Sequence, residues 1–77
     1  MTKNEKIKLE QRRIQTIKNQ LPTVKIRVAG KTITGQIKGR LLPFAQVVYT
    51  HRQTPFTAEY SWNAVARAVY EKRTLAL

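Results

Sequence analysis

Residues 24–38 read VKIRVAGKTITGQIK, and this stretch decides the fold. Apolar and polar side chains alternate over 24–28 and again over 32–38, which is the pattern of two strands that each bury one face. Between them, Gly30 tolerates the positive φ of a tight turn. Gly35 removes a side chain in mid-strand, which predicts a strong bend or the close approach of another backbone. The stretch therefore predicts an antiparallel β-hairpin with one apolar and one basic face.

The residues before this hairpin predict a helix over residues 1–21. Thr2 and Glu5 have the spacing of a capping box, in which each side chain satisfies a free N–H of the first turn. Apolar residues recur at helical spacing up to Leu21, and Pro22 ends the helix because the residue before a proline disfavours helical geometry.

Two further strands are predicted after the hairpin, over 44–50 and 56–62, so that antiparallel strands occupy residues 23–62. The period then changes to that of a helix, and residues 63–73 are predicted as a short C-terminal helix with Asn63 as its N-cap. Connections this short require antiparallel neighbours.

An alternative for the last segment is a bent edge strand over residues 66–70. The helix is favoured because alanine is poor in strands, and because Arg67 and Glu71 have the spacing of an i,i+4 ion pair. The predicted class is α+β: a small, strongly bent antiparallel sheet or barrel of about four strands, with an N-terminal helix and a short C-terminal helix, in a single domain covering 1–77.

Composition excludes several classes of function. The 77 residues contain 15 Lys and Arg, 4 acidic residues and no cysteine, and the net charge is +11. There is no aspartate for a Ser-His-Asp arrangement, and one histidine without clustered carboxylates predicts no metal site. We therefore expect neither an enzyme nor a cofactor. No apolar run is long enough to span a bilayer and the N-terminus lacks a signal-peptide stretch, so a cytoplasmic protein without a membrane partner is expected.

The basic face of the hairpin suggests nucleic acid as the partner. Lys25 and Arg27 share one side of their strand, and no acid accompanies them. Ordinary solvated faces mix both signs, whereas cations between hydroxyl and amide groups suit a phosphodiester backbone. Tyr49 and His51, near a strand end and beside Arg52, are candidates to stack on bases. The candidate nucleic-acid-binding residues are Lys25, Arg27, Lys31, Gln36, Lys38, Arg40, Tyr49, His51 and Arg52.

The other aromatic side chains are expected mainly in the core. Phe56, Tyr60 and Trp62 share one parity in the fourth strand and are assigned to its inner face. Trp62 lies at a strand-to-helix corner, where part of its ring is expected to be exposed.

The first half of the chain resembles the Sm-like family, which includes the Hfq proteins. The resemblance covers the N-terminal helix and the first two strands. It rests on Val24-Lys25-Ile26, Gly30, Ile33, Gly35, Gln36 and Ile37. It implies a sharply bent second strand, ring assembly and RNA binding. The order of the elements is also similar to the coactivator-type fold that binds single-stranded DNA and dimerises.

The sequence thus predicts a non-enzymatic protein that binds RNA or single-stranded DNA through phosphate contacts from a basic sheet face. A homo-oligomer or a subunit of a larger complex is expected, because a chain this short has little core of its own. The alternative is a small basic adaptor subunit that binds a protein partner.

Overall fold

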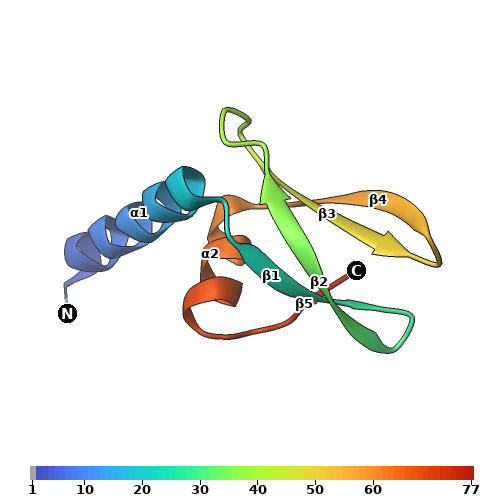
Figure 1. Ribbon diagram of the computed structural model, residues 1–77. Helices are drawn as coiled ribbons and strands as arrows, with labels where there is room; N and C mark the ends of the chain where they lie inside the picture. The colour runs from blue at the N-terminus through green and yellow to red at the C-terminus, as the bar shows by residue number, and fades with distance from the viewer. Residues whose placement is uncertain (1) are drawn as a thin grey trace.

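The computed structural model describes residues 2–77, which form two helices and one five-stranded sheet (Figure 1). The elements are α1 (Lys3–Gln20), β1 (Thr23–Val28), β2 (Lys31–Lys38), β3 (Ala45–His51), β4 (Thr54–Tyr60), α2 (Trp62–Tyr70) and β5 (Leu75–Ala76). The predicted α+β class, the N-terminal helix, the bent sheet and the short C-terminal helix are confirmed. The prediction of about four strands, all antiparallel, is wrong in detail, because β5 adds a fifth strand that runs parallel to β1.

Helix α1 has the ends that its sequence predicts. The Thr2 hydroxyl accepts a hydrogen bond from the Glu5 N–H, and the Glu5 carboxylate accepts one from the Thr2 N–H, both at 3.3 Å. At the other end Leu21 adopts the left-handed conformation, with φ 47°, and its N–H donates to the Ile17 carbonyl at 2.7 Å. Pro22 follows, and the chain turns directly into β1.

Two tight hairpins set the register of the sheet. Ala29 and Gly30 connect β1 to β2, and Arg52 and Gln53 connect β3 to β4; all four have positive φ. Positive φ at both central residues defines the type I′ turn, whose twist matches that of the flanking strands. The second turn is shorter than predicted, so that β4 occupies Thr54–Tyr60 instead of residues 56–62.

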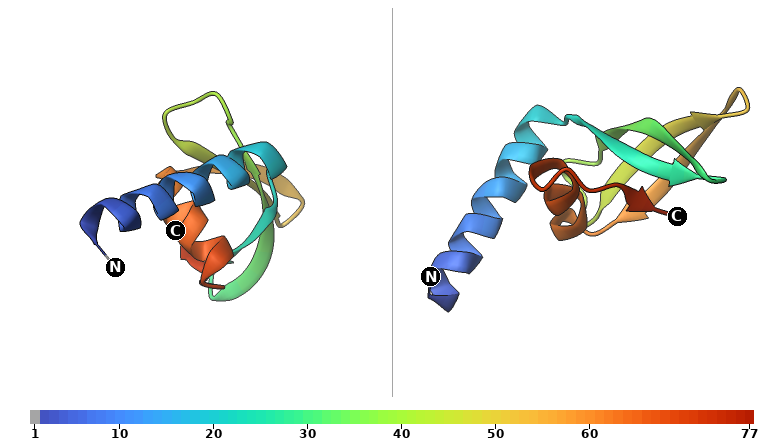
Figure 2. Two further views of the ribbon diagram at one scale, coloured as in Figure 1. Left: turned by 90° about the vertical axis from the view of Figure 1, so that its left-hand side faces the viewer. Right: turned by 90° about the horizontal axis from the view of Figure 1, so that it is seen from below.

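The sheet has the order β4-β3-β2-β1-β5 and curls into a half-barrel (Figure 2). Gly35 makes the curl possible, as it is buried on the concave side of β2. A Cβ built there would collide with Cγ1 of Val47 and would lie 3.7 Å from Cγ2 of Ile26. The close approach predicted from this glycine is confirmed, because β2 can pack this tightly on β3 only without a side chain.

A hydrogen bond joins the two edge strands of the curled sheet. The Tyr60 hydroxyl, at the end of β4, donates to the carbonyl of Ala76 in β5 at 2.9 Å. Burial raises the pKa of Tyr60 above its usual value of 10.0, and the neighbouring Tyr49 raises it further. The phenol is therefore held in its neutral, donating form.

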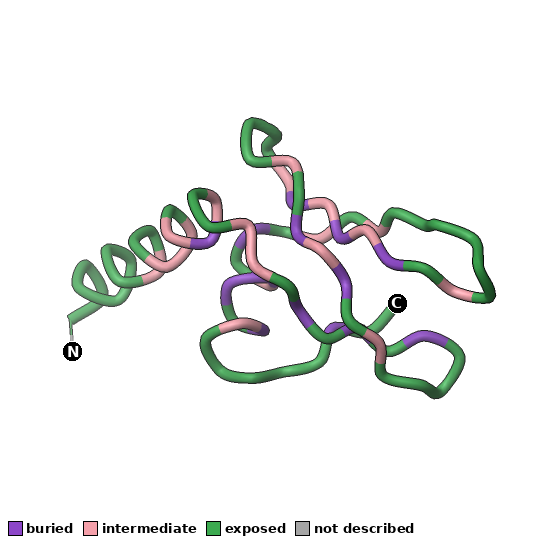
Figure 3. Tube along the Cα trace, viewed as in Figure 1, coloured by how far each residue is buried: buried purple, intermediate pink, exposed green. Residues whose placement is uncertain are grey.

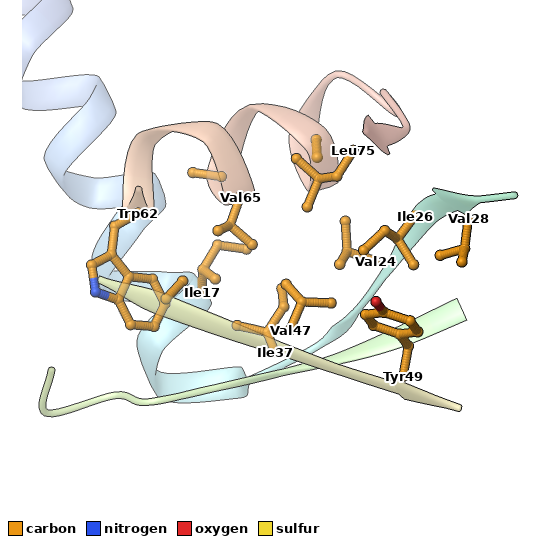
Figure 4. Close-up of a cluster of buried hydrophobic side chains, with 13 residues drawn as sticks. Ile17, Val24, Ile26, Val28, Ile37, Val47, Tyr49, Trp62, Val65 and Leu75 are labelled. Atoms are coloured by element: carbon orange, nitrogen blue, oxygen red, sulfur yellow. The ribbon is translucent and has the colours of Figure 1, made fainter. Parts of the chain in front are cut away.

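Helix α2 and the C-terminal end of α1 cover the concave face of the sheet (Figure 4). Buried residues alternate with exposed ones along β1 and with partly buried ones along β3, because only one face of each strand packs on the core (Figure 3). The buried core consists of Ile17, Val24, Ile26, Val28, Ile37, Ala45, Val47, Tyr49, Trp62, Val65, Ala66, Ala68 and Leu75. The Trp62 ring nitrogen donates to the Leu42 carbonyl at 3.0 Å and so ties α2 to the loop between β2 and β3.

The helical prediction for the C-terminal segment is confirmed, and the alternative of a strand over residues 66–70 is wrong. Its predicted bounds are corrected, because α2 ends at Tyr70 and its N-cap is Ser61, not Asn63. The Ser61 hydroxyl accepts a hydrogen bond from the Ala64 N–H at 3.1 Å. Serine is as good an N-cap as asparagine, so propensity alone does not separate the two positions.

The predicted ion pair within α2 does not form. Arg67 instead contacts Glu10 of α1, at 3.9 Å, and Glu71 contacts Arg73 at 3.0 Å. Glu71 is the C-cap of α2, and its N–H still donates to the Arg67 carbonyl at 2.8 Å, but each of the two side chains takes another partner. The Arg67 contact links the two helices.

Gly35→Ala is expected to lower the free energy of unfolding by about 1–3 kcal/mol, because the new methyl group overpacks a site closed by Val47. Urea denaturation measures this change. Adding Val47→Ala removes the colliding methyl group, so the double variant should lose less stability than the sum of the two single variants. Simple additivity would show that the close approach is not the cause.

Tyr60→Phe is expected to lower stability by about 0.5–1.5 kcal/mol at neutral pH, because the hydrogen bond to Ala76 is removed. The pKa of Tyr60 is raised on folding, so its contribution is complete below pH 10.0 and is lost as the pH rises through the folded-state pKa. The stability difference between wild type and Tyr60→Phe should therefore shrink above pH 10.0. Denaturation curves from neutral to alkaline pH test this, and a constant difference would contradict it.

Candidate nucleic-acid interface

The convex face of the β1–β2 hairpin carries two cations between two hydroxyl groups. The register places Lys25 opposite Thr34 and Arg27 opposite Thr32, and all four residues are exposed. Lys25 and Arg27 are two residues apart, which is about 6.6 Å along the strand. We call these four residues the hairpin face. The predicted side for Lys25 and Arg27 is therefore confirmed.

Lys25 and Arg27 of the hairpin face form no ion pair with a carboxylate within the described residues. The two ion pairs within residues 2–77 engage Arg67 and Arg73, so Lys25 and Arg27 are not neutralised. Glu59 lies on the same side of the sheet, but on β4, which is three strands from β1. That separation corresponds to about 14 Å, beyond a Debye length at physiological salt. Glu59 is therefore too far away to neutralise Lys25 or Arg27.

The other two predicted cations of this surface lie farther away. Lys38 is on the same face, but four residues beyond Thr34 along β2, or about 13 Å. Its neighbour across the sheet is Gln46, which in turn is paired with Glu59. Arg40 is exposed in the loop after β2. The structure thus forms a tight pair of cations with two outlying ones, not a compact group of four.

Gln36 was expected to contact the ligand and is instead engaged within the protein. It is half-buried, and its side-chain amide donates to the carbonyls of Leu21 and Ile37. The Leu21 carbonyl is free because α1 has ended there, so the amide satisfies a helix-end acceptor. Gln36 holds the α1–β1 junction and does not extend the hairpin face.

The predicted role of Tyr49 in base stacking is also contradicted. Tyr49 belongs to the buried core, and its ring stacks on Phe56 with centroids 5.7 Å apart. It shares the inward parity of Val47, which excludes it from the convex face. Trp62, expected to be partly exposed, is buried and covered by the Lys18 ammonium group 5.1 Å from its ring.

Phe56, in contrast, is more exposed than predicted. It points to the concave side of β4, yet 44 % of its surface is accessible, because the β3–β4 hairpin extends past α2 (Figure 1). Tyr60, on the same side, is half-buried. The strands therefore place no aromatic ring on the convex face beside Lys25 and Arg27.

The remaining predicted residues lie at the two hairpin tips. Lys31 follows the first turn and is exposed, as is Arg52 within the second turn, whereas His51 is half-buried opposite Thr54. Both tips lie at the same end of the sheet, away from α1 (Figure 1). Lys31 adjoins Thr32 of the hairpin face, whereas His51 and Arg52 lie at the tip of the other hairpin.

A cleft beside β1 brings in two cations that the sequence analysis missed. It measures about 440 Å³ and lies between α2 and the start of β1, where β5 does not pair. Its polar lining is formed by Thr23, Lys25, Thr34, Lys72 and Arg73. Lys72 and Arg73 were assigned to the predicted helix over 63–73, but α2 ends before them and the chain turns back toward β1. In the sequence, the only indication of this second group of cations was the pair Lys72-Arg73 directly after the apolar face of the helix.

Within the part of the chain that the structure describes, no three His, Cys, Asp or Glu side chains lie together in a way that suits a metal ion. Neither of its helices is long and apolar enough to cross a membrane. The groups that the hairpin face offers to a ligand are therefore the cations of Lys25 and Arg27 and the hydroxyl groups of Thr32 and Thr34.

Comparisons of the chain with protein-family models, with curated proteins and with solved structures found no match in any of the three.

Proposed function

We propose that this protein is a non-enzymatic nucleic-acid-binding protein whose hairpin face holds the phosphate backbone. The observation that supports this most is the pair Lys25 and Arg27, exposed and unneutralised between Thr32 and Thr34. Lys72 lines the cleft at the edge of the same strand and extends the positive region, whereas Arg73, which also lines the cleft, is paired with Glu71.

The side chains of the hairpin face match the chemistry of a phosphodiester. An arginine guanidinium donates two parallel hydrogen bonds to phosphate oxygens, whereas a lysine ammonium acts as a point charge. The threonine hydroxyls add single donors between them. Each neutralised phosphate releases condensed counterions, so affinity should fall steeply with salt. The net charge of +11 also attracts the polyanion from a distance.

The burial of the aromatic rings decides how a ligand is held. RNA or single-stranded DNA was favoured partly because Tyr49 was expected to stack on bases, and Tyr49 is buried. Without rings on the hairpin face, the proposed contact is made to phosphates, which RNA and DNA share. Binding by this face is therefore proposed to be tolerant of sequence.

The double charge reversal Lys25→Glu/Arg27→Glu is expected to weaken binding to unrelated oligonucleotides by the same factor. The slope of log K against log salt should become shallower by about two, one for each phosphate that the variant no longer neutralises. Fluorescence anisotropy with labelled oligonucleotides at several salt concentrations measures both quantities.

The matched control is Lys3→Glu/Lys6→Glu, which changes the net charge by the same amount on the first turns of α1. With single-stranded oligonucleotides as the probe, it should retain most of the affinity and of the salt slope. Equal effects in the two double variants would mean that net charge alone, and not the hairpin face, governs binding.

A second candidate function, a small basic adaptor subunit, rests on exposed apolar side chains. Leu41 is 90 % exposed in the loop after β2, and Leu42, Ile7, Leu9 and Tyr70 are also exposed. Such residues are typical of contacts with a protein, either a different subunit or a further copy of this chain.

A pull-down from nuclease-treated extract separates the two functions. For an adaptor, a protein partner should remain bound after nuclease treatment and should no longer be captured by Leu41→Asp. For the nucleic-acid-binding function, nuclease treatment should release the bound material from wild type and from Leu41→Asp alike.

A further inference from the structure

Helix α1 projects from the body of the protein. Its N-terminal half extends beyond α2 and the sheet (Figures 1 and 2), and every residue from Lys3 to Leu9 is exposed. Only Ile17 of this helix is fully buried. At 1.5 Å per residue, its 18 residues are about 27 Å long.

The side of α1 that faces away from α2 carries only amides and cations. At 100° per residue, six residues fall within an arc of about 100°, and all six are exposed. They are Asn4, Lys8, Gln11, Arg12, Gln15 and Asn19. We call them the amide stripe. It contains no acidic and no apolar side chain.

Three charged side chains outside this side of the helix make contacts within the protein. Glu10 pairs with Arg67, and the Arg13 guanidinium lies 5.1 Å from the centre of the Tyr70 ring. Glu5 is taken up by the capping box. Within the amide stripe, the structure shows only the hydrogen bond from Gln15 to Asn19, at 3.2 Å. The stripe is thus left for an external partner.

The composition of the amide stripe matches the edges of DNA bases. Asn and Gln side chains make paired hydrogen bonds to N6 and N7 of adenine, and Arg or Lys bind O6 and N7 of guanine. A helix about 10–12 Å across fits the major groove of B-form DNA, which is about 12 Å wide. The major groove of RNA duplexes is too narrow and deep for side chains to read.

We propose that α1 lies in the major groove of double-stranded DNA, where the amide stripe reads base edges. The inference rests on the proposed function, since phosphate contacts from the hairpin face would supply the sequence-independent part of the affinity. DNA is favoured as the partner because the stripe contains the cations Lys8 and Arg12 and no acidic residue, which suits a polyanion. A helix that docks on a protein presents apolar residues at i, i+3 and i+4, and the stripe presents none.

Selection from a library of random double-stranded DNA tests the proposal with the full chain. Wild type should enrich a common sequence and bind it at least tenfold more tightly than a shuffled duplex. Gln11→Ala/Gln15→Ala should lose this preference while binding the shuffled duplex within about twofold of wild type. Alanine favours the helix more than glutamine does, so α1 should be preserved, as circular dichroism would verify.

The control variant Gln20→Ala/Asn63→Ala removes two exposed amides that lie outside the stripe. It should keep the sequence preference. Replacing the purines of the enriched duplex with 7-deazapurines removes the major-groove N7 acceptors. This should weaken wild type by about tenfold and weaken Gln11→Ala/Gln15→Ala less, because that variant has already lost two of the side chains that contact N7 while Lys8 and Arg12 remain.

The outcomes separate the two proposals. Binding to the shuffled duplex, to single strands or to RNA without any enriched sequence would overturn the role of α1 and leave the phosphate contact standing. Absence of binding to every nucleic acid would overturn the proposed function itself. A concentration-dependent increase in mass by analytical ultracentrifugation that Gln11→Ala/Gln15→Ala abolishes would identify a second copy as the occupant and would also overturn the proposal.

Discussion

The close passage of β2 over β3 at Gly35 is the constraint on which the rest of the structure depends. Because this position has no side chain, Val47 and Ile26 fill the concave side and the sheet can curl around them. The curl leaves room for α2 on one face only and brings the edge strands near enough for Tyr60 to bond Ala76. Apolar side chains are thereby collected inside, and Lys25 and its neighbours are left in water.

The sequence correctly predicted those elements whose structure depends on residues close together in the chain. The capping box at Thr2, the proline after α1 and the alternation over residues 24–38 depend on neighbours a few positions away, and each reappears in the structure. β5 could not be predicted in this way, because two residues have no period. It exists since β1 leaves part of its edge open, which is a property of the folded chain.

The candidate site was predictable to the same extent. Alternation placed Lys25 and Arg27 correctly, and the parity shared with Val47 would have placed Tyr49 inside had it been applied. Gln36 has outward parity but turns to a carbonyl that the end of α1 leaves free, which requires the three-dimensional junction to be known. Lys72 joins the surface because α2 ends early, and helix ends are the least certain feature of a pattern.

Because β5 is the last strand in the chain, its pairing with β1 can form only late in synthesis. Ile26 is paired with Leu75, 49 positions later in the chain, and Leu75 is buried in the core. A ribosome adds about 5–20 residues each second, so several seconds separate the synthesis of the two partners. Until residues 75–76 have been synthesised, Ile26 and Arg27 have no partner strand on the outer edge of β1.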